Sequence, residues 1–181
     1  PDIDEHYHSF HGAIQESEHV FIRPGLNYFM APRVSILEIG FGTGLNALLS
    51  LIHGKKCQIH YHAIEKWPVP PDLLEQLNYP AILESIDPEA GKYFRQIHQC
   101  KWESLTQLTP FFEIYKEQTD LRDFQNKENF DIVYFDAFAP DKQPELWTPP
   151  IIQNICQAIN HGGILTTYTA KGTVKRALKE A

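Results

Sequence analysis

Hydrophobic residues occur in short apolar runs that alternate with stretches in which apolar side chains recur at helical spacing. The runs predict five strands, over residues 34–40, 58–64, 111–115, 130–135 and 164–169. Helical spacing predicts helices over residues 43–53, 146–159 and 173–181, with shorter helical pieces near 72–78 and 88–98. Strands that alternate with helices are typical of parallel βαβ units. The pattern therefore predicts an α/β fold with a doubly wound, mostly parallel sheet.

The first thirty residues differ from the rest of the chain. Residues 1–30 are rich in aromatic residues and histidine and contain the helix breakers Gly12, Pro24 and Gly25. They predict an N-terminal arm or hairpin in which residues 19–22 form a short strand. Residues 31–181 are expected to form one domain, with a proline-punctuated helical insertion at about 66–109 on the sheet edge.

Composition narrows the class of protein. The formal net charge of −7 over 181 residues argues against nucleic-acid binding through bulk positive charge alone. Cys57, Cys100 and Cys156 are far apart and form no CxxC pair, which predicts neither a zinc site nor a disulfide framework and fits a reducing cytoplasm. The most apolar stretch, residues 34–52, contains Glu38, three glycines and Asn46, so no membrane span is expected. The chain begins without methionine and ends inside a predicted helix, which suggests a trimmed chain.

A glycine-rich turn, Glu38-Ile39-Gly40-Phe41-Gly42-Thr43-Gly44, follows the first predicted strand and opens the first predicted helix. Glycines let the backbone turn tightly and approach a ligand closely, and the helix N-terminus supplies free N–H groups. Ligands of open α/β sheets bind at the carboxyl ends of the strands, where this turn lies. The spacing is GxGxG with an acid two residues before the first glycine, whereas a dinucleotide fingerprint is GxGxxG. A nicotinamide enzyme is therefore disfavoured.

Three acidic residues follow later strands at the same edge. Glu65 lies about twenty residues past the turn, where an acid can bind both ribose hydroxyls, although a solvated carboxylate is the alternative. Asp120 follows the third predicted strand and suits the N-cap of a helix over 121–125, while a similarity to enzymes that bind S-adenosylmethionine would imply an adenine contact instead. Asp136 lies on an irregular turn that ends at Pro140, where it can orient a substrate amine or form an Asx-type turn. Phe138 then lines a substrate slot or packs in the core.

Histidine and basic residues add weaker signals. His6, His8 and His11 lie in the N-terminal arm without cysteine or carboxylate partners, so no metal site is predicted. His60 and His62 alternate along a strand and should share one face of the sheet. Basic residues cluster at Lys55–Lys56 and around the last helix, at Lys171, Lys175, Arg176 and Lys179. The second cluster fits either phosphate contact or a solvated helix face.

Four segments together resemble the methyltransferase domain of the bifunctional MnmC proteins and their stand-alone relatives. They are His19-Val20-Phe21 after Glu16; Glu38 through Asn46 (EIGFGTGLN); Phe135 through Pro140 (FDAFAP) with Pro144-Glu145-Leu146-Trp147; and Gly162-Gly163-Ile164-Leu165 leading to Tyr168-Thr169-Ala170-Lys171-Gly172. The run Phe138-Ala139-Pro140 with Pro144 and Trp147 is more specific than the glycine-rich turn. The resemblance spans nearly the whole chain and is weakest from 66 to 110.

The resemblance implies a Rossmann-like class I S-adenosylmethionine (SAM) methyltransferase that makes 5-methylaminomethyl-2-thiouridine at the wobble position of tRNA. The fold of the family continues into further C-terminal strands, which are expected to be missing here. The implied site residues are Asp136 for catalysis; Glu38, Gly40, Phe41, Gly42, Gly44, Asn46, Glu65, Asp120 and Asp136 for SAM; and Phe138, Pro140 and Lys171 for the substrate. A FAD-dependent oxidoreductase domain or protein would lie outside this chain. The family often has Gly-Asp where this chain has Thr119-Asp120, which weakens the adenine contact.

Three other functions remain compatible with the same residues. The chain could methylate a small-molecule or protein amine, or transfer an aminopropyl group from decarboxylated SAM on the same fold. It could also be a non-catalytic partner subunit, which would not bind SAM. A methyl-transfer assay with tRNA against a panel of metabolites distinguishes the first of these from the tRNA enzyme.

Overall fold

The structure is a computed structural model that describes residues 10–29 and 31–181, with the side chains of residues 12–29 and 31–181. Within these residues, six strands form one sheet in the order β3-β4-β2-β1-β5-β6. They are β1 (Arg33–Ile39), β2 (Gln58–Ile64), β3 (Thr106–Thr109), β4 (Phe112–Glu117), β5 (Phe130–Phe135) and β6 (Ile159–Thr166). The edge strand β3 runs antiparallel to β4, and the other neighbouring pairs are parallel. The predicted doubly wound, mostly parallel sheet is confirmed.

The central strands match their predicted bounds because they are buried on both faces. β2 and β5 occupy the predicted residues, and β1 is displaced by one residue. All three end in four consecutive buried residues, so their sequences are nearly continuous apolar runs without alternation. A continuous apolar run is stable only where both faces of the strand are buried. The sequence therefore indicates which residues form these strands and that the strands lie in the middle of the sheet.

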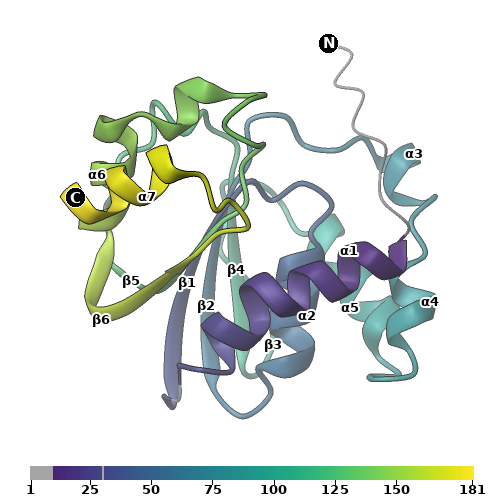
Figure 1. Cartoon of the computed structure of the whole chain (residues 1–181). Helices are drawn as coiled ribbons and strands as arrows, with labels where there is room; N and C mark the ends of the chain where they lie inside the picture. Colours follow the sequence, from purple (N-terminus) through teal and green to yellow (C-terminus); the bar gives the residue numbers. More distant parts are fainter. Residues whose placement is uncertain (1–9, 30) are drawn as a thin grey trace.

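Helices cover both faces of this sheet (Figure 1). One face carries α1 (Phe10–Ser17), η1 (Glu18–Leu26), α2 (Leu45–His53) and α5 (Ala90–Gln99), and the short helices α3 (Pro71–Leu74) and α4 (Tyr79–Leu83) lie on this side of the molecule. The other carries η2 (Pro144–Trp147), α6 (Pro149–Gln157) and α7 (Gly172–Glu180). Each face has its own apolar core. One core is centred on Leu48 and Ile36 and the other on Val133 and Ile152.

The N-terminal segment is helical, so the predicted hairpin with a strand over 19–22 is wrong. Residues 10–17 form α1, which continues into the π-helical turns of η1. Ile14, Phe21 and Leu26 lie on one side of this helix and enter the core. Gly25 is required by packing, because a Cβ there would lie 2.8 Å from Cε1 of Tyr134. The sequence interpretation treated this glycine as a turn residue and therefore missed the helix.

Several further elements differ from the prediction. The edge strand β3 was not predicted, since it lies in the stretch expected to be a helical insertion, and β4 extends to Glu117 where the predicted strand ends at residue 115. The helix expected over 146–159 is divided into η2 and α6 at Pro149, since a proline starts a helix but cannot continue one. The turn expected at 161–163 lies inside β6 and forms an irregularity in its pairing with β5, where Gly162 has a φ of 83°. Extra residues are thus accommodated in β6 without ending the strand.

The cysteines and the two histidines of β2 have defined places in the structure. Cys57, Cys100 and Cys156 are free thiols. Nδ1 of His60 lies 2.8 Å from Glu113, and Nε2 of His62 lies 3.0 Å from Glu117. The two histidines therefore share one face of the sheet, as predicted. In the described part of the chain, no helix combines the length and the apolar character that crossing a membrane requires.

The N-terminal helix should contribute strongly to stability. The Phe21 ring packs on Tyr134 with their centroids 5.5 Å apart, and Phe21 is 2% exposed. Replacing Phe21 with alanine should lower the free energy of unfolding by about 3–5 kcal/mol, since it opens a cavity in the core. The matched control is Tyr28→Ala, at a residue that is 76% exposed, which should change stability by less than about 0.5 kcal/mol. Urea unfolding of both variants tests this, and equal small effects would contradict the packing described.

Candidate active site

The glycine-rich turn joins β1 to α2 at the carboxyl edge of the sheet. Gly40, Gly42 and Gly44 have φ values of 88°, 50° and 71°, which lie in the region that favours glycine. Gly40 has a second constraint, because a Cβ there would lie 2.6 Å from the carbonyl oxygen of Asp136. The turn between β1 and α2 is therefore in contact with the loop that follows β5.

Glu65 binds this turn from the end of β2. The backbone N–H of Gly42 donates to Oε2 of Glu65 over 3.0 Å, and the N–H of Trp67 donates to Oε1 over 2.8 Å. Each carboxylate oxygen can accept a further hydrogen bond. The structure brings Glu65 to the glycine-rich turn, where a ribose contact remains a prediction.

Glu38 lies beneath the turn and is fully buried. Tyr61 donates its hydroxyl proton to Oε2 over 2.9 Å, whereas Oε1 has no hydrogen-bond partner among the described residues. Burial raises the pKa of Glu38 well above its usual value, and the negative charge of Asp136 raises it further. A buried carboxyl group with one unused oxygen is well suited to a ligand that brings a positive charge or an N–H group.

Asp136 is the first residue after β5, and Asn46 connects it to the helical layer. The backbone N–H of Asp136 donates to the carbonyl of Ile39 over 2.9 Å. Nδ2 of Asn46 donates to Oδ2 of Asp136 over 2.8 Å, while the Oδ1 atom of Asn46 accepts a hydrogen bond from the hydroxyl of Ser17. Asn46 is thereby held in one orientation between α1 and the loop after β5. Sequence reasoning missed Ser17, because no local pattern relates an N-terminal serine to this loop.

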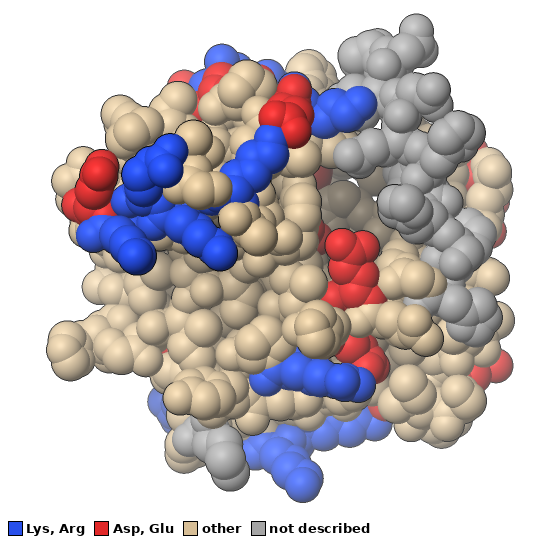
Figure 2. Space-filling model, in the orientation of Figure 1, with Lys and Arg blue, Asp and Glu red and all other residues tan. Residues whose placement is uncertain are grey.

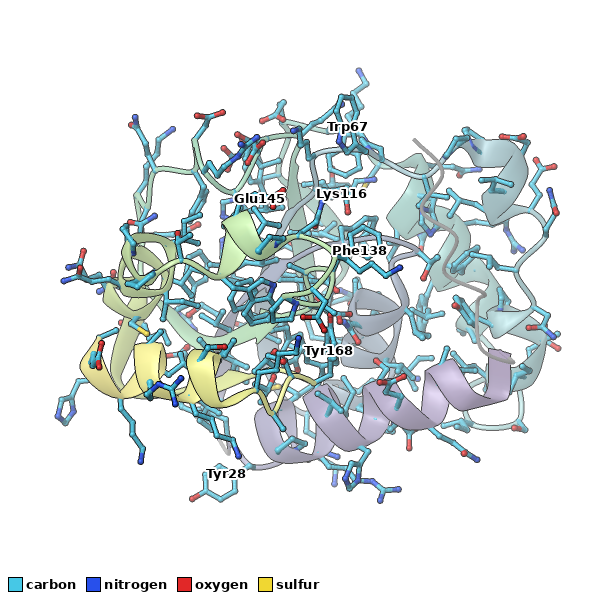
Figure 3. All side chains as sticks on the ribbon, turned by 45° about the horizontal axis from the view of Figure 1, so that its top comes forward. Tyr28, Trp67, Lys116, Phe138, Glu145 and Tyr168 are labelled. Atoms are coloured by element: carbon cyan, nitrogen blue, oxygen red, sulfur yellow. The ribbon has the colours of Figure 1, made fainter. Side chains whose placement is uncertain are left out.

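Distant aromatic residues hold the loop that follows Asp136. Trp147 stacks on Phe135 with centroids 4.3 Å apart and donates its indole N–H to the carbonyl of Phe138 over 2.8 Å. Tyr168 donates its hydroxyl proton to the carbonyl of Ala137 over 2.7 Å. Figure 3 shows Phe138 and Tyr168 on the loops that follow β5 and β6. The two separate motifs of the sequence resemblance thus meet at this loop, which leaves Phe138 40% exposed.

Pro140 and Lys171, the other residues predicted to bind the substrate, lie in the same region. Pro140 is half-buried at the end of the loop. Lys171, the N-cap of α7, forms an ion pair with Asp141. This ion pair joins the end of the loop to the start of α7, so Lys171 is near the candidate acceptor side of the site.

Asp120 is engaged in a small ion network. Its carboxylate accepts hydrogen bonds from the backbone N–H and the guanidinium of Arg122 and lies 2.9 Å from Nζ of Lys66. Hydrogen bonds from Arg122 hold the pKa of Asp120 well below its usual range. Residues 121–125 contain a turn and no helix, so the N-cap alternative is wrong. An adenine contact stays a prediction, and it would require Asp120 to share its carboxylate with these cations.

A layer of packed side chains supports the turn from below. Phe41 is buried, and its ring meets Trp102 edge-on at 5.8 Å, so its side chain serves packing under the turn. Nε2 of His98, at the end of α5, donates to the carbonyl oxygen of Thr43 over 3.2 Å. A Cβ on Gly44 would lie 2.9 Å from the Phe41 ring, which shows how closely this layer fits. Sequence reasoning missed His98 and Trp102, since both come from the stretch where the resemblance is weakest.

The charge of the site favours a cationic ligand. Glu38, Glu65 and Asp136 come from three adjacent strands and meet at the turn, and the last two both raise the pKa of Glu38 through their charge. Among the described residues, no lysine or arginine forms an ion pair with Glu38 or Glu65. Such a site would repel the phosphates of a dinucleotide. SAM carries a sulfonium and an ammonium group, so it fits both this charge and the unused oxygen of Glu38.

For the part of the chain that is described, no group of three or more His, Cys, Asp or Glu is placed to hold a metal ion.

Comparison with known proteins identifies the class. The family described as S-adenosyl-L-methionine-dependent methyltransferase matches residues 86–181, which is just over half of the chain. The chain therefore belongs to this family of SAM-dependent methyltransferases, and SAM is its cofactor.

Individual relatives point in the same direction. The tRNA 5-methylaminomethyl-2-thiouridine biosynthesis bifunctional protein MnmC of Pseudoalteromonas atlantica is 31% identical over 98% of this chain and 28% of its own length. The chain thus spans less than a third of the length of this relative. The crystal structure of MNMC2 from Aquifex aeolicus has a TM-score of 0.69 at 22% identity and covers 93% of this chain and 54% of that one. The N-methyltransferase NodS of Bradyrhizobium japonicum has a TM-score of 0.55 at 16% identity over 97% of this chain and 84% of that one. These two structures show that the fold is that of a methyltransferase.

His98 should make stability depend on pH. Burial, together with the positive charge of Lys116, lowers the pKa of His98 from 6.5 to about 4. The unfolded chain therefore takes up a proton at pH values where the folded protein does not, and stability falls as the pH drops from 6.5 towards 4. By pH 4.5 the loss attributable to His98 should reach about 2 kcal/mol.

A pair of variants isolates this contribution. His98→Gln keeps a donor but cannot be protonated. Between pH 7 and pH 4.5, its free energy of unfolding, measured in urea, should fall by about 2 kcal/mol less than that of the wild type. His161→Gln, at an exposed histidine, should retain the wild-type pH profile. Parallel profiles for His98→Gln and wild type would show that His98 is not the group responsible.

Proposed function

We propose that the chain uses SAM to methylate the amine of the 5-aminomethyl group on the wobble uridine or 2-thiouridine of tRNA, forming 5-methylaminomethyl-2-thiouridine. The observation that carries the proposal is the position of Asp136, whose loop is held against the glycine-rich turn by the residues of the MnmC-like motifs. The 31% identity to proteins named for biosynthesis of this nucleoside supports the choice of acceptor.

The cofactor would be held by residues of three strands. The unused Oε1 of Glu38 would accept a hydrogen bond from the ammonium group of SAM, and Gly40, Gly42 and Gly44 would let the amino-acid end approach the backbone. Glu65 would bind the ribose hydroxyls. Asn46 would keep Asp136 oriented towards the cofactor, and Asp120 would stand at the adenine end. When bound, SAM supplies an electrophilic methyl group on a positively charged sulfur.

Asp136 would act on the acceptor amine. Its carboxylate would accept a hydrogen bond from the neutral amine and so fix the direction of the nitrogen lone pair. The same negative charge would offset the positive charge that develops on nitrogen as its bond to the methyl carbon forms. No acid is needed to assist a leaving group, so positioning would provide much of the rate enhancement.

Exposed side chains around Asp136 suit a nucleoside. Phe138 presents a ring at the mouth of the site, where it would stack on the uracil base, and Pro140 would bound the slot. Lys171 would reach a neighbouring phosphate. The aminomethyl substrate would come from another activity, consistent with the bifunctional name of the longer relatives. A tRNA acceptor and three free thiols favour the cytoplasm as the place of action.

A basic surface on α7 supports an RNA acceptor. Lys175, Arg176 and Lys179 are exposed on this helix, and none forms an ion pair within residues 10–29 and 31–181. Figure 2 shows Lys and Arg side chains gathered over α7, at the left of the view. The opposite side of the helix is apolar and buried through Val174 and Ala177. The negative charge of the whole chain is thus separated from a local surface that suits phosphates.

Transfer of a radiolabelled methyl group from SAM to tRNA that carries the unmethylated aminomethyl group tests the proposal. The full-length protein should label this tRNA, and Asp136→Asn should lower kcat by roughly 10²–10³ while the Kd for S-adenosylhomocysteine (SAH) changes by less than about threefold. Asp123→Asn, at an exposed carboxylate outside the site, is the matched control and should turn over like wild type.

Two results of this assay would count against the proposal. Wild-type turnover by Asp136→Asn would remove Asp136 from the mechanism. Labelling of a small amine in place of tRNA would assign a different acceptor to the same site.

The basic surface makes its own prediction. Reversing two charges in Lys175→Glu/Arg176→Glu should raise KM for tRNA by about tenfold or more at low salt and make its salt dependence shallower, since fewer counterions are released. The KM for SAM should not change. Arg33→Glu/Lys56→Glu changes the same charge at the opposite edge of the sheet and should leave the KM for tRNA near wild type. Equal effects of the two double variants would indicate a response to net charge alone.

A further inference from the structure

Strand β4 places a lysine in the apolar core. Phe112, Ile114 and Lys116 alternate with half-buried polar residues, so all three point to the face covered by α2 and α5. Lys116 is 1% exposed. An apolar residue is expected at such a position, because removing an ammonium group from water is costly unless other groups replace the hydration.

The replacement for water comes from the end of α5. Nζ of Lys116 donates to the carbonyl oxygen of Ile97 over 2.7 Å and lies 3.4 Å from that of His98. These are among the last carbonyls of the helix, where the helix dipole is negative. The ammonium also lies over the rings of Trp102 and Phe41, at 4.9 and 5.6 Å from their centroids. Within the described residues no carboxylate forms an ion pair with Lys116. The helix carbonyls, the two ring faces and the side chain of Cys100, with which Lys116 also interacts, surround its charge instead.

The last turn of α5 also bears on the glycine-rich turn. His98 donates to the Thr43 carbonyl, and its ring packs on Phe41 at 5.8 Å. The position of the His98 ring depends on the backbone that Lys116 binds. A change at Lys116 would therefore move the carbonyl of Thr43 and tilt the N–H groups of the turn.

We propose that Lys116 is a positioning residue that acts through His98 to hold the glycine-rich turn in the shape that binds SAM. The inference rests on the assignment of this turn to SAM. Lys116 lies under the turn and is 1% exposed, so it presents almost no surface to a ligand. Its effect should therefore appear in the binding of SAM and not in the binding of tRNA.

The test replaces Lys116 with methionine, which has a similar length and no charge or donor. For Lys116→Met, the Kd for SAH by calorimetry and the KM for SAM should rise about tenfold or more, because the turn is no longer held in place. The kcat at saturating SAM and the KM for tRNA should stay within about threefold of wild type. Lys116→Arg, which keeps the charge and the donors, should recover at least part of the affinity.

A control separates this role from a general loss of stability. Ile114→Ala removes a fully buried side chain from the same strand and the same face. It should lower the melting temperature while leaving the Kd for SAH near wild type. Lys116→Met should show the opposite behaviour, since replacing a buried charge with an apolar residue is often neutral or stabilising.

A double-mutant cycle tests the route through His98. His98→Leu should weaken SAH binding. The double variant Lys116→Met/His98→Leu should bind SAH no more weakly than the single variant with the lower affinity, because both changes release the same contact. Wild-type SAH affinity in Lys116→Met, or fully additive effects in the cycle, would overturn the inference. If the wild-type protein does not bind SAH, the assignment of the turn to SAM fails first, which is a distinguishable result.

Discussion

The site depends on the parallel pairing of β1 with β5. Ile39 pairs with Phe135 at the carboxyl ends of these strands, and the next residue on each, Gly40 and Asp136, leaves the sheet in contact with the other. The chain proceeds from β1 to β2 on one side and from β5 to β6 on the other, so the connections reverse direction between β1 and β5. A crevice at such a point is the usual ligand site of open α/β sheets. The close approach at Gly40 brings the glycine-rich turn and the loop of Asp136 together at one edge of the sheet.

The electrostatic design follows from this arrangement. Adjacent strands deliver Glu38, Glu65 and Asp136 to one crevice, where the negative charges of Asp136 and Glu65 repel a charged Glu38 and add to burial in raising its pKa. A cationic cofactor would relieve that repulsion, so part of its binding energy would come from removing an unfavourable interaction between carboxylates in the free protein. Positive charge is displaced to α7, at the surface. A single net charge of −7 therefore conceals two regions with opposite preferences.

Much of the fold and part of the site could be predicted from the sequence, for a physical reason. Strands buried on both faces, such as β2 and β5, must be apolar throughout, and a turn such as 40–44 must be glycine-rich, so local residues suffice. The N-terminal helix was missed because Gly25 is dictated by the ring of Tyr134, which is distant in sequence. Lysine side chains are mostly exposed, so the burial of Lys116 follows only from the packing of α5 over β4. The roles of Ser17 and His98 likewise depend on contacts that only the folded chain creates.

The loop of Asp136 is fastened by Trp147 and Tyr168, which lie after it in the chain. His98, Trp102 and Lys116, which support the glycine-rich turn from below, all precede β5. During synthesis from the N-terminus, this support can form before β5 emerges, whereas the contact between the glycine-rich turn and the loop of Asp136 must wait until β5 pairs with β1. Methylation competence would arise only when η2 and the segment after β6 have docked.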